Sequence, residues 1–166
     1  MTPLFLLVSI LLSFSCKCQG DLIGDVCPNT RNPSLCNQTL RADIRSPTAS
    51  IRGLGEIILE NAQASTQATL DVAKAINNKK DNIVGEADIC IKTCNDAIHN
   101  LNGCLPLPKA RDRESVSALK AKVTTALTDV STCDEEFGAR EPPQLKKASS
   151  KAKDFISMLL VFADRL

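Results

Sequence analysis

The stretch IVGEADICIKTCNDAIHNL, residues 83–101, decides the fold class of this chain. Its apolar and small residues recur every three or four positions, which places them on one face of an α-helix and leaves polar residues on the other. These positions are Ile83, Ala87, Cys90, Cys94, Ala97 and Leu101. The spacing predicts an amphipathic helix that packs against other helices through this face.

Three more stretches show helical spacing. One begins near Ser46, which we expect to cap a helix that has Pro47 as its first residue. The core positions expected along it are Ile51, Leu54, Ile58, Ser65, Ala68, Val72 and Ala75. Those expected along residues 116–137 are Val116, Leu119, Val123, Ala126, Val130, Cys133 and Phe137, and those along residues 145–166 are Leu145, Ala148, Ala152, Phe155, Leu159, Phe162 and Leu166. Gly- and Pro-containing turns separate the last three helices. Residues 46–166 are therefore predicted to form an up-down-up-down four-helix bundle.

Residues 21–45 are predicted to form a small helical hairpin in front of the bundle. Its two short helices, Asp21 to about Asn29 and Ser34 to about Ala42, meet across Pro28 and Pro33. A Cys27–Cys36 bridge would close this hairpin. The expected fold class is all-α.

The helical register predicts one disulfide directly. Cys90 and Cys133 lie on core faces of neighbouring antiparallel helices, equidistant from the turn near residues 111–112, so their sulfurs can bond. Cys94 and Cys104 are separated by about 15 Å along a straight helix, which is too far for a bond. Both are left unassigned.

The N-terminus has the pattern of a secretory signal peptide, residues 1–20. An apolar run from Pro3 to Phe14 is too short to span a bilayer, and the small residues Cys18 and Gly20 suit a cleavage site. Removal would leave residues 21–166 as one domain with six cysteines, an even set typical of disulfides in exported proteins. Asn37 begins an Asn-Gln-Thr glycosylation motif.

Composition argues against several classes of ligand. The 20 basic and 19 acidic residues nearly cancel, so no field favours nucleic acid or an anionic membrane. Trp and Tyr are absent and Phe occurs five times, which disfavours stacking on sugars or bases. Residues 109–114, KARDRE, mix both signs; we interpret them as a solvated helix start with Asp112 near the cap, the alternative being a small recognition patch.

No residue pattern indicates catalysis, a metal or a cofactor. His99 is the only histidine and lies off the core face, so no second histidine exists for a zinc site. The run Asp134–Glu136 is expected mostly on the outer face of its helix. Cys94 is interpreted as a buried small hydrophobe rather than a nucleophile. Asn61 and Gln67 are expected to set register or lie at the rim of the core.

The cysteine motifs resemble those of the plant invertase and pectin methylesterase inhibitors. CPNTRNPSLC, residues 27–36, is similar to the family's Cys-x-x-Thr-x-x-Pro-x-Leu-Cys hairpin motif, and ALTDVSTCDEEF, residues 126–137, to its fourth-cysteine motif. Leu40, Ala49, Leu54, and Cys90 with Ala97 and Leu101, also fall at matching positions. The resemblance covers essentially residues 21–166. The departures are Cys94, where the family commonly has Tyr, and Cys104.

The resemblance implies the hairpin-and-bundle fold, with disulfides Cys27–Cys36 and Cys90–Cys133. It also implies a secreted protein of the apoplast and cell wall that is not an enzyme, but binds a carbohydrate-active enzyme one to one and blocks its substrate cleft. Invertase inhibitors of the family are associated with a Pro-Lys-Phe motif about fifteen residues before the fourth cysteine, where this chain has Val116-Ser117-Ala118. Pectin methylesterase is therefore the expected target and invertase the alternative.

Two other classes remain open from the sequence. A carrier of lipids or other hydrophobic ligands is disfavoured because plant lipid-transfer proteins have adjacent cysteines and a Cys-x-Cys motif in the mature chain. Here the only Cys-x-Cys is Cys16 to Cys18, inside the expected signal peptide. A receptor ligand would share the bundle shape. The sequence assigns no individual target-contact residue.

Overall fold

The computed structural model describes residues 21–79, 82–108 and 112–166. The expected signal peptide, residues 1–20, and residues 109–111 of the KARDRE stretch lie outside them. The described residues form helices and no strand, which confirms the all-α prediction. The α-helices are α1 Leu22–Val26, α2 Pro33–Ala42, α3 Ile51–Asn77, α4 Val84–Asn102, α5 Arg113–Phe137 and α6 Pro143–Ala163; short 3-10 helices span Cys27–Asn29, Ser46–Thr48 and Gly138–Arg140.

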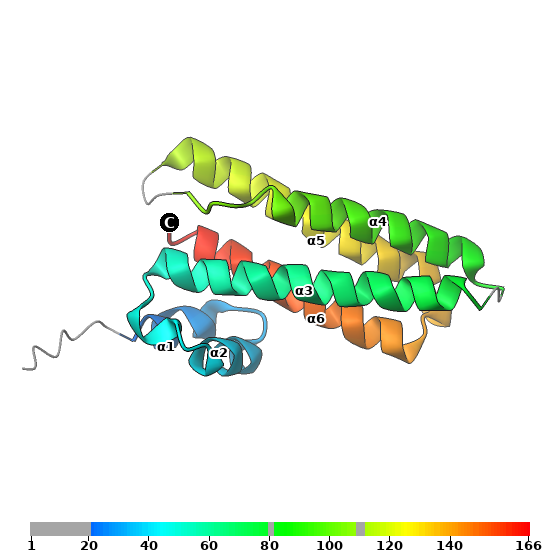
Figure 1. The fold of residues 1–166 in the computed structure, drawn as a ribbon, viewed down its shortest axis with the longest axis horizontal. Helices are drawn as coiled ribbons and strands as arrows, with labels where there is room; N and C mark the ends of the chain where they lie inside the picture. The colour runs from blue at the N-terminus through cyan, green and yellow to red at the C-terminus, as the bar shows by residue number, and fades with distance from the viewer. Residues whose placement is uncertain (1–20, 80–81, 109–111) are drawn as a thin grey trace, which may run out of the picture.

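The four long helices lie side by side, each with two neighbours. α3 contacts α4 and α6, and α5 contacts the same two helices from the other side. The short helices α1 and α2 lie beside α3, on the side of the molecule away from α4 and α5 (Figure 1). No helix in the described ranges is both long and apolar enough to cross a membrane.

Asn32 fixes the start of α2. Its side-chain Oδ1 accepts a hydrogen bond of 3.1 Å from the backbone N–H of Leu35, and Pro33 follows as the first helical residue. The sequence pattern predicts a helix start at Ser34 and does not indicate this cap. The helix then buries Cys36 and Leu40 against the bundle.

The predicted start of α3 at Ser46 was wrong. Ser46–Thr48 form a separate 3-10 turn, and the extended backbone of Ala49 interrupts the chain before the helix begins at Ile51. The cap is Ser50, whose hydroxyl accepts a hydrogen bond of 3.3 Å from the N–H of Gly53. Ser46 and Ser50 are both residues that suit an N-cap. The extended backbone at Ala49 separates Ser46 from the helix, so Ser50 is the cap.

The predicted core face of α3 was correct at its start and wrong further along. Leu54, Ile58 and Ser65 are buried, but Ala68 and Ala75 are exposed. The buried line instead continues through Ala62, Thr66, Thr69, Leu70, Ala73 and Ile76. The expected positions follow a seven-residue repeat, which drifts by about 20° per heptad relative to a straight helix of 3.6 residues per turn.

The core faces of the other three long helices largely match the prediction. On α4 the five predicted positions from Ala87 to Leu101 are buried, and on α5 all those from Leu119 to Phe137 are buried. On α6, Leu145, Phe155 and Phe162 are buried, together with positions that the sequence analysis did not name: Ser149, Ile156 and Met158. The buried apolar residues form two clusters, a larger one that includes Leu54 and Phe155 and a smaller one that includes Leu70 and Phe137.

Candidate functional site

Two disulfide bonds hold the fold, between Cys27 and Cys36 and between Cys90 and Cys133. Their Cα atoms lie 5.5 Å and 4.2 Å apart, respectively. The first bond joins α2 to the turn after α1, and the second joins α4 to α5, whereas α3 and α6 contain no cysteine. Closing these loops in the unfolded chain contributes about 3 and about 4 kcal/mol in a chain-entropy model. The second bond therefore fixes one pair of neighbouring long helices.

A third sulfur lies beside the second disulfide. The Sγ of free Cys94 is 4.0 Å from the Sγ of Cys90, and the Sγ atoms of Cys90, Cys94 and Cys133 lie within 4.8 Å of one another. Burial, reinforced by the negative charges of Asp134 and Asp129, raises the pKa of Cys94 to about 12. Two of the three sulfurs are bonded to each other, so the oxidised cluster does not offer three thiolates to a metal ion.

Cys104, the other free cysteine, is also buried. Its Sγ donates a hydrogen bond of 3.3 Å to the carbonyl of Asn100. Burial raises the pKa of Cys104 to about 11, and the nearby Lys122 partly opposes this shift. Both free thiols are therefore protonated at neutral pH and behave as small apolar side chains.

The acidic run at the end of α5 differs from its prediction. Glu135 and Glu136 are exposed as expected, but Asp134 is partly buried. The Oδ2 of Asp134 pairs with Lys153 of α6, and its Oδ1 is buried without a hydrogen-bond partner. Spacing within α5 does not predict the burial of Asp134, because its partner Lys153 lies on α6. The run thus contributes to the α5–α6 contact rather than to an acid–base site.

The remaining polar candidates have local roles. His99 is exposed in the last turn of α4. The amide of Asn61 donates a hydrogen bond of 2.9 Å to the carbonyl of Ile57. The amide of Gln67 donates one of 2.9 Å to the carboxylate of Asp71, one turn later. These contacts stabilise α3 locally and bring no catalytic groups together.

Asn37, the residue expected to carry a glycan, lies partly exposed on α2. Its Nδ2 donates a hydrogen bond of 2.9 Å to the carbonyl of Pro33, and its Oδ1 accepts one of 3.3 Å from Nε of Arg41. Glycosylation at this residue stays a prediction.

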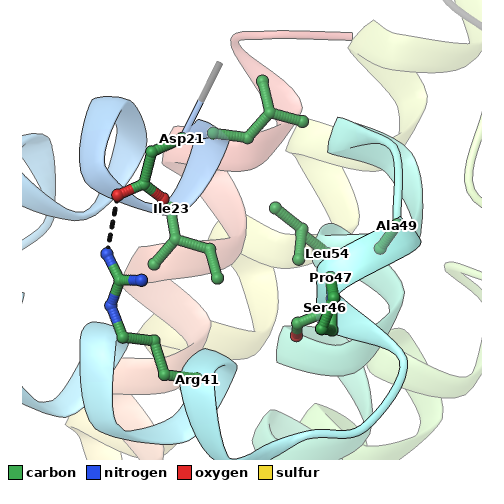
Figure 2. A pocket seen from close by; sticks show the side chains of 8 residues that line it. Asp21, Ile23, Arg41, Ser46, Pro47, Ala49 and Leu54 are labelled. Atoms are coloured by element: carbon green, nitrogen blue, oxygen red, sulfur yellow. Dashed lines mark hydrogen bonds and ion pairs between the residues drawn. The ribbon is translucent and has the colours of Figure 1, made fainter. Parts of the chain in front are cut away.

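A hollow of about 400 Å³ lies between α1, the end of α2 and the start of α3 (Figure 2). Ile23 and Leu54 supply apolar walls, and Arg41 pairs with Asp21 at 2.7 Å on one side. The hydrogen bond from Arg41 holds the pKa of Asp21 below its usual value of 3.8. Because the two charges satisfy each other, the hollow presents no unpaired charge to a ligand.

The hairpin covers one side of the bundle and leaves another side free. The Nδ2 of Asn32 donates a hydrogen bond of 2.9 Å to the Oδ2 of Asp154 in α6. The Nε of Arg31 lies 3.7 Å from the Oδ1 of the same carboxylate. α4 and α5 lie away from the hairpin and turn their outer sides to solvent (Figure 1). We call this surface the outer α4–α5 face; it includes the exposed residues Ile89, Lys92 and Asp96 of α4 and Ala121, Thr125 and Thr128 of α5.

Short, already hydrogen-bonded side chains characterise the α5 part of this face. The hydroxyl of Thr125 donates a hydrogen bond of 3.0 Å to the carbonyl of Ala121, and that of Thr128 donates one of 3.1 Å to the carbonyl of Thr124. A partner that covers them displaces no long flexible side chain and leaves no hydroxyl without an acceptor. The α5 part of the outer α4–α5 face is therefore suited to close packing against another protein.

Comparison with known proteins agrees with the motifs and the fold. The family model described as plant invertase/pectin methylesterase inhibitor matches residues 21–161. A pectinesterase inhibitor from Actinidia deliciosa is 31% identical over 156 residues, covering 92% of this chain and 83% of that protein.

Two solved structures have similar folds. One is a mutant form A of a pectin methylesterase inhibitor from Arabidopsis, with a TM-score of 0.72 and 22% identity, covering 89% of this chain and 98% of that chain. The other is a pectin methylesterase inhibitor from Arabidopsis thaliana, with a TM-score of 0.62 and 21% identity, covering 89% and 97%. These relatives are inhibitors rather than enzymes, and this chain is likewise not an enzyme. It belongs to the plant invertase/pectin methylesterase inhibitor family.

Proposed function

We propose that this protein inhibits a pectin methylesterase by forming a one-to-one complex that covers the substrate cleft. The observation that carries the proposal is the 31% identity to a pectinesterase inhibitor across 92% of the chain. The sequence Val116-Ser117-Ala118, in place of the Pro-Lys-Phe associated with invertase inhibitors, favours the esterase over invertase.

The contact surface in this proposal is the outer α4–α5 face. The hairpin does not cover it, and the Cys90–Cys133 bond fixes the two helices that form it. A rigid surface loses little conformational entropy on association, so more of the contact energy contributes to affinity. The target's cleft would be closed by the helices rather than by a loop inserted into it.

The cellular location belongs to the same proposal. Residues 1–20 would direct export and be removed, leaving residues 21–166 as the inhibitor domain in the apoplast. Two buried disulfides support this location, because such bonds persist in oxidising compartments outside the cytosol.

Titration against purified enzymes tests the proposal. Increasing amounts of the secreted protein are added to a pectin methylesterase and, separately, to an acid invertase, and residual activity is measured. Esterase activity should fall linearly and reach its minimum at one equivalent, while invertase activity stays unchanged. Native mass spectrometry should detect a complex with one copy of each protein. Inhibition of invertase alone would favour the alternative target, and inhibition of neither would reject both.

A further inference from the structure

Three buried sulfurs meet where α4 packs against α5. Cys90 and Cys133 are bonded, and the free thiol of Cys94 lies one helical turn after Cys90 on the same face of α4. All three side chains are fully buried in one cluster with Leu70, Phe137 and Leu145. Cys104, the other free cysteine of the described chain, does not belong to this cluster.

We propose that Cys94 is an alternative partner for Cys133, so that the α4–α5 crosslink can move from Cys90 to Cys94 by thiol–disulfide exchange. This inference concerns the bundle itself and is independent of the enzyme that the protein binds. It gives the free thiol of Cys94 a role that the sequence left unassigned.

The geometry favours Cys133, rather than Cys90, as the lasting partner of Cys94. A Cys90–Cys94 bond would lie within α4, where residues four apart have Cβ atoms about 5–6 Å apart, whereas a disulfide requires about 3.5–4.5 Å. Cys133 projects from α5, and its Sγ lies within 4.8 Å of the Sγ of Cys94. A Cys94–Cys133 bond joins the same two helices about 6 Å further along α4.

The exchange needs no external oxidant or reductant. The thiol of Cys94 loses its proton to solvent, and the resulting thiolate attacks the Sγ of Cys133. The Cys94–Cys133 bond forms as the Cys90–Cys133 bond breaks, and Cys90 leaves as a thiolate that takes up a proton. One disulfide and one thiol are present before and after the step.

Burial makes this step slow in the folded protein. Asp134 and Asp129 of α5 add to the burial that raises the pKa of Cys94 to about 12, and Lys153 of α6 pairs with Asp134. Little thiolate therefore exists at neutral pH. The exchange rate should rise about tenfold for each pH unit between pH 7 and pH 10, as the thiolate fraction does.

Peptide mapping of the disulfides tests the proposal. The protein is produced from its full coding sequence in a secretory host. The native protein is incubated at pH 7 and at pH 10, quenched with acid, alkylated under denaturing conditions and digested without reduction. Peptides containing Cys16 or Cys18 are followed in the same map. We expect a Cys94–Cys133 peptide with alkylated Cys90 to accumulate about 1,000-fold faster at pH 10 than at pH 7. C104S should behave like the wild type, and C94S should keep Cys90–Cys133 as its only bond between α4 and α5.

The variant C90S provides a second test. Expressed in the same way, it should form Cys94–Cys133, whereas C90S/C94S should leave Cys133 alkylated. Helical circular dichroism identifies folded samples. A folded C90S protein with both Cys94 and Cys133 alkylated would overturn the proposal. If C90S does not fold, the wild-type map decides. Absence of the Cys94–Cys133 peptide at pH 10, or release of alkylated Cys90 in C94S at the wild-type rate, overturns the proposal.

Discussion

Asn32 at the start of α2 donates a hydrogen bond of 2.9 Å from its Nδ2 to the Oδ2 of Asp154 in α6, 122 residues later. The same side chain accepts a hydrogen bond from the N–H of Leu35. One amide therefore caps α2 and attaches the hairpin to the last helix of the bundle.

Replacing Asn32 by Ala should lower the free energy of unfolding by about 2–3 kcal/mol. The lost cap contributes about 1 kcal/mol, and the lost hydrogen bond to the carboxylate about 1.5 kcal/mol. Asn32→Ser keeps a capping oxygen without reaching Asp154, so it should lose about half as much. Urea unfolding of the three proteins measures the difference. Equal losses in Ala and Ser would show that the bond to Asp154 contributes nothing.

Two glycines should respond to alanine in opposite directions. Gly138, which follows α5, has φ +49° and ψ −126°, a conformation that side chains rarely adopt. Gly138→Ala should destabilise the protein by about 1–2 kcal/mol. Gly85, in the first turn of α4, has open space around an added Cβ, and Gly85→Ala should stabilise it by about 0.5 kcal/mol. Unfolding curves of both variants check the signs; a shift of Gly138→Ala towards greater stability would contradict the backbone assignment.

Glu141→Gln should change how stability depends on pH. Burial, followed by the charge of Asp134, raises the pKa of Glu141 above its ordinary value of 4.5, while Lys146 and Lys153 oppose the shift. The folded protein therefore holds this proton more tightly than the unfolded chain. The resulting stabilisation is complete below pH 4.5 and is lost as pH rises through the folded-state pKa.

The glutamine variant stays neutral and keeps a donor for the hydrogen bond to Asp134 that also raises the pKa of Glu141. Its Tm should exceed that of the wild type near pH 7, and the difference should disappear by about pH 4. Circular dichroism melts across this range measure it, with Glu135→Gln, at an exposed position, as the control. A difference that is the same at both pH values would exclude the titration of Glu141 as its cause.

Thr128→Arg should weaken inhibition of pectin methylesterase if the outer α4–α5 face contacts the enzyme. A long charged side chain on this face would hold the two proteins apart, and a loss of about 1.4 kcal/mol raises the inhibition constant about tenfold. Gln38→Arg introduces the same side chain on the exposed side of α2 and should change the constant by less than about twofold. The enzyme assay compares both variants, and circular dichroism verifies their folding. Equal effects would place the contact elsewhere.

The all-α class could be predicted from the sequence because apolar residues recur every three or four positions along each segment. Spacing sufficed for α4 and α5, where every core position from Ala87 to Leu101 and from Leu119 to Phe137 is buried. It also placed Cys90 opposite Cys133, and the structure bonds that pair. In α3, buried polar residues hide the signal: Thr66 and Thr69 are fully buried because their hydroxyls donate to the carbonyls of Ala62 and Ser65.

Local sequence patterns did not predict the contacts between residues that are far apart in the sequence. The partners of Asn32 and Asp134 lie on α6, and no spacing within α2 or α5 indicates them. The helical register predicted the Cys90–Cys133 bond but left Cys94 unassigned, so the position of Cys94 beside that disulfide was not predicted. The outer α4–α5 face likewise depends on where the hairpin packs, which only the assembled fold shows.

The placement of the disulfides divides the bundle into two unlike pairs of helices. α4 and α5 are joined covalently, whereas α3 and α6 are held by packing and polar contacts alone. When heat or mechanical stretching begins to open the oxidised molecule, we expect α3 and α6 to detach first, while α4 and α5 remain tethered together. A protein released from such stress would then reassemble on a preserved two-helix template, which favours refolding over further unfolding.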